Sequence, residues 1–116
     1  MPKALIARER LQQLLDAPRR ERARIAIVGD AMLDIYLRGD VDRISPEAPV
    51  PVVRVRERRR ALGGAANVAQ NVAALGAEGE LVAAVGSDAP GAELRAMLSA
   101  LGANTRGLVD TARPTT

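Results

Sequence analysis

The stretch GGAANVAQNVAALGAEGELVAAVG, from Gly63 to Gly86, decides the fold of this chain. A glycine pair opens a helix of small residues, Gly76 ends the helix, and a strand over Glu80–Val85 follows. Two glycines at a helix start let a ligand approach bare backbone N–H groups, where the positive end of the helix dipole favours oxygen-rich partners. The same glycines suit a helix entry packed tightly against a strand, and the spacing alone leaves both interpretations open.

The helix itself carries one candidate ligand-binding side chain. Asn67 falls in its first turn, and its amide can donate and accept hydrogen bonds at once, as a sugar hydroxyl requires. Asn71 lies one turn later, and we expect a structural role for it. Val68, Val72 and Leu75 recur at helical spacing and predict the face that packs on a sheet, while alanines fill the remaining surface.

Upstream, Ile25–Val28 is a continuous apolar run ended by Gly29. Such a run predicts a central parallel strand buried on both faces. Asp30 and Asp34 follow this strand, and ligands of open α/β sheets bind beyond the carboxyl ends of the strands. Each aspartate is therefore a candidate site residue, although an Asp after a strand is also a common turn former.

Between this strand and the glycine pair, Ile35–Gly39 and Val50–Arg58 predict two strands outside the main sheet. Three prolines, at positions 46, 49 and 51, fix an extended path between them and exclude a helix. The second strand alternates valine and arginine. It fits either a lid over a ligand or an edge strand that proline and arginine protect against aggregation.

The ends of the chain add two helices and a third strand. Ala4–Asp16 predicts an amphipathic helix ended by Pro18, and a basic connector follows it. Ser87 or Asp88 is expected to cap a later helix. The apolar face of that helix is predicted to contain Leu94, Met97, Leu98 and Leu101. Gly102 is expected to end the helix, and Asn104–Val109 to form the next strand. Alternating strands and helices predict a layered α/β sheet with a small β appendage.

The composition excludes several classes of protein. The chain has 116 residues, a formal net charge of +3, no cysteine, no histidine and one aromatic residue, Tyr36. Thiol nucleophiles, disulfides, histidine bases and the usual zinc sites are therefore excluded. Base stacking on nucleic acids has almost no aromatic side chain to use, so we expect no nucleic-acid partner. Without a signal peptide or a long apolar run, we expect a cytoplasmic protein that does not contact the membrane.

The glycine-rich stretch resembles the first signature of the PfkB (ribokinase-like) carbohydrate kinases. The segments GDAMLD (Gly29–Asp34) and RISPEAPVPVV (Arg43–Val53) narrow the resemblance to the kinase domain of the heptose 7-phosphate kinases, which act in lipopolysaccharide-core synthesis. The resemblance implies a ribokinase-like three-layer α/β/α fold with a β lid at about residues 35–60. Residues 24–116 would be its N-terminal, sugar-binding part, incomplete at the C-terminus, and residues 1–23 a helix and basic connector.

The resemblance also implies a reaction and a set of site residues. The γ-phosphoryl group of ATP would pass to the anomeric hydroxyl of heptose 7-phosphate with the help of Mg²⁺. Asp34, Gly63, Gly64 and Asn67 would hold the sugar, and we expect Arg43 on the lid to bind the phosphate of the substrate. The ATP site and the catalytic base of the family lie beyond Thr116, so we assign no catalytic residue and no metal ligand, and expect this chain alone to be inactive. The lid strands would join two copies in a homodimer.

Two alternatives remain at this point. The same glycines would serve a non-catalytic sugar- or nucleotide-binding α/β module, or a PfkB kinase for another sugar. A dinucleotide fingerprint does not follow the first strand, where the sequence is GDAMLD, and the chain contains no P-loop motif.

Overall fold

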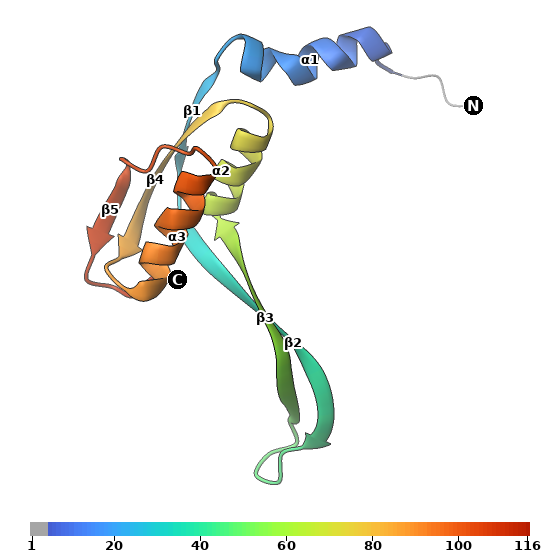
Figure 1. Ribbon diagram of the computed structural model, residues 1–116, viewed down its shortest axis with the longest axis vertical. Coiled ribbons are helices and arrows are strands. Elements are labelled where there is room, and N and C mark those ends of the chain that lie inside the picture. The colour runs from blue at the N-terminus through green and yellow to red at the C-terminus, as the bar shows by residue number, and fades with distance from the viewer. Residues whose placement is uncertain (1–4) are drawn as a thin grey trace.

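The computed structural model describes residues 5–116 and shows a small parallel sheet from which a long antiparallel hairpin projects (Figure 1). Strands β1, β4 and β5 form the parallel sheet with β4 in the middle, and β2 pairs with β3. The predicted α/β class is confirmed. In chain order the elements are α1 (Arg8–Arg20), β1 (Arg24–Val28), β2 (Ala31–Ile44), β3 (Pro51–Gly64), α2 (Ala65–Ala74), β4 (Glu78–Gly86), α3 (Ala89–Ala100) and β5 (Leu108–Thr111).

The parallel sheet is covered by helices on one face only in the part of the chain that the structure describes. Helices α2 and α3 lie on the same side of it (Figure 1), and along β4 Leu81 and Val85 are buried while Val82 is exposed. Ile25 and Val28 on the edge strand β1 keep 42% and 78% of their surface exposed. The expectation of a strand buried on both faces is therefore wrong for residues 5–116, which build two of the three predicted layers.

Small residues bring α2 close to this sheet. Ala66 and Ala69 are completely buried and Val72 is nearly so, whereas Val68 and Leu75 are about half exposed. The predicted apolar stripe is thus right for Val72 and wrong for the other two. The alanine face lets the helix axis approach the sheet more closely than a valine and leucine face would, and close packing favours that orientation.

Both helices end as the sequence predicts. Gly76 and Gly102 follow α2 and α3 with φ angles of 83° and 76°, the left-handed conformation that suits glycine after a helix. At the start of α3, Asp88 rather than Ser87 is the capping residue, and its carboxylate accepts a hydrogen bond of 2.9 Å from the backbone N–H of Gly91.

Helix α3 packs through the face that its periodicity predicts. Leu94 and Leu98 are completely buried, Met97 packs at the margin of the core, and Leu101 remains 39% exposed. Strand β5 begins later than predicted, because the side chain of Asn104 accepts a hydrogen bond from the backbone N–H two residues on and holds a turn there.

The hairpin of β2 and β3 is longer than its two predicted strands. Leu33 and Leu62 at its base are buried in the same core as α3, so the pairing continues from the outer lid into the body of the protein. Register shifts after Arg38 and after Val41 mark irregularities of the kind that twist a ribbon. The radius of gyration is 19.6 Å, against about 13 Å for a compact chain of this length, because the hairpin and α1 extend from the body.

Helix α1 runs from Arg8 to Arg20, later than the predicted Ala4–Asp16, and Ala4 lies outside the described residues. Pro18 lies inside the helix instead of ending it. Proline removes its own N–H donor and crowds the carbonyl four residues earlier, but the helix continues to Arg20, and the N–H of Glu21 still reaches the carbonyl of Ala17 at 2.9 Å. None of the residues of α1 is buried.

Candidate functional site

The structure brings Asp34 and Gly63 into direct contact at the base of the hairpin. Asp34 lies on β2 opposite Ala61 of β3, and its half-buried side chain leans diagonally over Gly63. A Cβ atom on residue 63 would lie 2.4 Å from the Asp34 Oδ2 atom. The carboxylate therefore occupies space that any other residue at position 63 would fill, beside bare backbone at the entry to α2.

Gly64 makes the turn from β3 into α2. Its φ of 55° and ψ of −134° lie in a region that residues with a Cβ rarely adopt, and a Cβ there would lie 2.4 Å from the carbonyl oxygen of Asp30. That carbonyl accepts a hydrogen bond of 2.7 Å from the N–H of Ala65. The second glycine thus fixes the path of the backbone, and it places the start of α2 next to the carboxyl end of β1.

The start of α2 has no side-chain cap, so apart from the N–H of Ala65, which the carbonyl of Asp30 accepts, its first turn presents backbone donors at the positive end of the helix dipole. Asn67 lies in this turn and is exposed to solvent. A carboxylate acceptor, an amide that donates and accepts, and uncapped N–H donors make a set that suits neighbouring hydroxyl groups. Asp30 is exposed, and the structure gives its backbone carbonyl rather than its carboxylate a hydrogen bond at this site.

Arg43 lies elsewhere in the structure. It is exposed near the outer end of β2, opposite Val52 and nine positions beyond Asp34. At the usual rise along a strand, nine positions correspond to about 30 Å. The structure therefore does not bring Arg43 together with Asp34 of the same chain.

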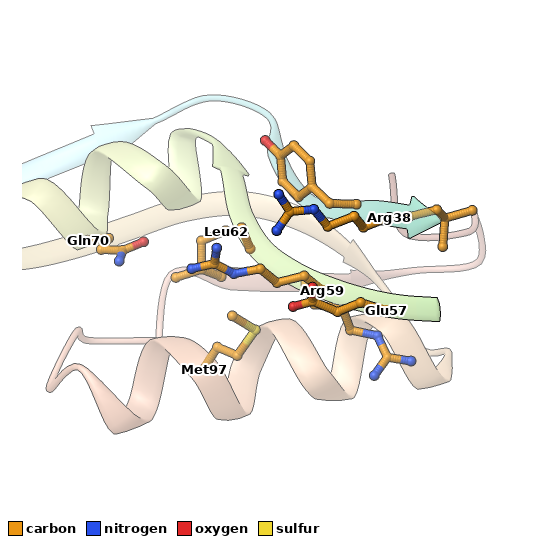
Figure 2. A pocket seen from close by; sticks show the side chains of 10 residues that line it. Arg38, Glu57, Arg59, Leu62, Gln70 and Met97 are labelled. Carbon is orange, nitrogen blue, oxygen red and sulfur yellow. The ribbon is translucent and has the colours of Figure 1, made fainter. Parts of the chain in front are cut away.

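A hollow of about 620 Å³ lies between the hairpin and the two helices, and Figure 2 shows the side chains that line it. Arg38 on β2 and Glu57 and Arg59 on β3 border it, with Gln70 of α2 and Met97 of α3 on its other sides. The wall of the hollow also includes Ala61, which lies opposite Asp34, and Leu62, which precedes Gly63. The sequence analysis placed the alternating arginines of β3 in a lid or a protected edge strand and did not predict this arrangement.

A second feature that the sequence did not reveal lies at the carboxyl end of β4. The backbone N–H of Thr115 donates a hydrogen bond of 2.8 Å to the carboxylate of Asp88, and the Thr115 hydroxyl donates a second one. The same hydroxyl accepts a hydrogen bond of 3.0 Å from the N–H of Gly86. These hydrogen bonds hold the pKa of Asp88 below its ordinary value. A Cβ on Gly86 would lie 2.7 Å from the Thr115 nitrogen, so glycine at this position leaves room for the contact.

Among residues 5–116, no three acidic, histidine or cysteine side chains gather as a metal site built wholly from protein side chains would require. No helix in the same range is long and apolar enough to cross a bilayer. The chain is thus an α/β protein with a parallel sheet and a projecting hairpin. Asp34, Asn67 and the start of α2 suit a ligand rich in hydroxyl groups.

The chain belongs to the pfkB family of carbohydrate kinases, whose family model matches residues 22–116. It is 57% identical over 100 residues to the D-beta-D-heptose 7-phosphate kinase of Bordetella bronchiseptica, a match that covers 86% of this chain and 32% of that protein. It is 54% identical to the bifunctional protein HldE of Caulobacter vibrioides, covering 79% of this chain and 19% of that one. The chain thus spans a third or less of these relatives.

A solved structure confirms the ribokinase-like architecture. The fructokinase of Xylella fastidiosa with bound ATP superposes with a TM-score of 0.63 at 30% identity, over 81% of this chain and 28% of the fructokinase chain. The resemblance inferred from the glycine-rich stretch and from GDAMLD is therefore confirmed at the level of family and fold.

Proposed function

We propose that this chain supplies the sugar-binding half of an ATP-dependent kinase that phosphorylates the anomeric hydroxyl of heptose 7-phosphate. The contact between Asp34 and Gly63 beside the uncapped start of α2 carries the proposal. It holds a carboxylate acceptor against bare backbone at the carboxyl edge of the sheet, where α/β proteins bind their ligands. A carboxylate there accepts hydrogen bonds from sugar hydroxyls that are about twice as strong as those to neutral acceptors.

The sugar is proposed from the relatives, since two similar proteins carry heptose 7-phosphate kinase or HldE in their names. ATP as the donor is supported by the ATP bound to the similar fructokinase. In this proposal, the ATP and Mg²⁺ chemistry comes from other parts of a kinase of the relatives' length. We call such a protein, one that contains these residues at the relatives' length, the complete kinase.

The deciding experiment measures ATP consumption by the complete kinase with heptose 7-phosphate, fructose and ribose in parallel. We expect turnover with heptose 7-phosphate at the highest kcat/KM of the three. A preference for fructose or ribose would instead favour a kinase for another sugar. Sugar binding without turnover of any of them would favour the non-catalytic binding module.

A further inference from the structure

We propose that the hollow beside the hairpin base is an anion subsite and that Arg59 is its principal binding residue, with a phosphate monoester on the sugar as its ligand. The inference rests on the proposed function, because it names the part of the same site that would hold the phosphate already present on the substrate. It replaces Arg43 in that role, because Arg43 lies about 30 Å from Asp34 along β2.

The charges around the hollow favour an anion. Three arginines line it against one glutamate, namely Arg38, Arg59 and Arg60 against Glu57. Arg60 is already paired, since its Nε lies 3.2 Å from a carboxylate oxygen of Glu93 on α3. Within residues 5–116, neither Arg38 nor Arg59 forms an ion pair or a side-chain hydrogen bond. Two guanidinium forks are thus available, and their planar geometry matches phosphate oxygens.

The register of the hairpin puts Arg59 on the same face as the sugar-binding carboxylate. Asp34 lies opposite Ala61, and Tyr36 lies opposite Arg59 two positions further out. Directly opposed residues share a face, and positions two apart on a strand return to it. Arg59 therefore lies about 7 Å along the strand from the level of Asp34, a distance that a sugar with phosphate on its terminal carbon can span.

The remaining walls supply weaker partners and an apolar surround. The Tyr36 hydroxyl and the Gln70 amide can each donate a hydrogen bond to a phosphate oxygen. Leu62 is buried and Met97 partly buried on the side of the helices. Apolar neighbours lower the local dielectric, which strengthens a charged hydrogen bond formed next to them. The volume of about 620 Å³ is within the usual range for small-ligand pockets.

The test is calorimetric titration of the complete kinase with heptose 7-phosphate and, separately, with unphosphorylated heptose. Arg59→Ala should weaken binding of the phosphorylated sugar by about ten- to a hundredfold and leave the unphosphorylated sugar unchanged. Arg58→Ala is the matched control, because Arg58 is the neighbouring exposed arginine and does not line the hollow. Arg59→Gln provides a second variant with a similar length should the alanine variant fold poorly.

Equal weakening of both sugars, or unchanged affinity for the phosphorylated one, would overturn the assignment of Arg59 while leaving the sugar site in place. An equal effect of Arg58→Ala and Arg59→Ala would also overturn it, by pointing to general surface charge. Failure of the unaltered kinase to bind either sugar would overturn the proposed function and the subsite together. The separate titrations therefore distinguish these failures.

Discussion

The carboxylate of Asp34 lies where a side chain at Gly63 would have to be, with Oδ2 2.4 Å from the position of a Cβ on residue 63. The contact joins two segments that are far apart in the chain, GDAMLD and GGAAN. It also distinguishes the two glycines of the pair, since the first leaves room for a carboxylate and the second turns the backbone into α2.

Gly63→Ala should impair sugar binding at little cost to folding. The three atoms nearest to the added methyl group all belong to the carboxylate of Asp34, which can rotate away, so we expect the free energy of unfolding to change by less than about 1 kcal/mol. The carboxylate then leaves the site. Calorimetry on the complete kinase should show weaker heptose 7-phosphate binding in both Gly63→Ala and Asp34→Ala, by about ten- to a hundredfold. Unaltered affinity in Asp34→Ala would remove that residue from the site.

Gly64→Ala should behave in the opposite way, with its main effect on stability. Here the added Cβ meets a backbone oxygen, that of Asp30, and the φ of 55° is itself strained for alanine. Strain of this kind costs about 1–3 kcal/mol. Urea unfolding of the complete kinase should reveal this loss in Gly64→Ala and not in Gly63→Ala. A stability loss of the same size in both variants would contradict the division of roles.

Features controlled by local sequence could be predicted, and features that depend on a distant partner could not. The glycines that end the helices and the buried face of Leu94 and Leu98 follow from periodicity and from backbone conformation. The face of α2 was mistaken because it depends on how closely the helix approaches the sheet. The stripe containing Val68 is as regular as the alanine face that is actually buried.

The candidate site also combines residues that local motifs predict with a residue whose place depends on a distant strand. Asp34, Gly63 and Gly64 lie in recognisable motifs, and the structure places them together. The role of Arg59 depends on strand register, since Asp34 and Arg59 share a face only because β2 and β3 pair as they do. No periodicity within the run of arginines from residue 58 to residue 60 distinguishes the middle one.

The contact between Asp88 and Thr115 should make folding stability depend on acid pH. Hydrogen bonds to its carboxylate lower the pKa of Asp88 in the folded state, so the unfolded chain binds the proton more readily. The stabilisation is therefore complete above about pH 4 and is lost as the pH falls through the lower folded-state pKa. Denaturant midpoints of the complete kinase, measured from pH 7 to pH 3, should differ less between the unaltered protein and Thr115→Val at the acid end, where only the hydrogen bond from Gly86 to the Thr115 hydroxyl still separates them. A constant difference would contradict this coupling.

The hairpin should pair with a second copy of the chain. Val41 and Val53 lie opposite each other, both about half exposed, and Val55 continues the same apolar stripe on β3. A two-stranded ribbon is marginal in water by itself, and a two-fold partner would cover this stripe. Light scattering at micromolar concentration should show a dimer for the complete kinase and a monomer for Val53→Lys. Arg54→Lys, on the opposite face of the strand, is the control, and a monomeric unaltered protein would refute the pairing.

The 116-residue chain by itself should not transfer phosphate. Phosphoryl transfer needs donor, metal and base held in line with the acceptor, and the proposed function assigns the described residues contacts with the acceptor alone. Its stability should suffer as well. One face of the parallel sheet is open, with Val28 78% and Val109 63% exposed, so part of the apolar surface that would stabilise the fold remains in water.

We therefore expect no ATP consumption with heptose 7-phosphate from the purified 116-residue chain, and a broad thermal transition in place of a cooperative one. The complete kinase under the same conditions is the control for both measurements. Because weak sugar binding requires only the acceptor contacts, calorimetry on the short chain could still detect it without any turnover. Measurable turnover, or a sharp transition near that of the complete kinase, would show that residues 1–116 already contain a working donor site and a closed core.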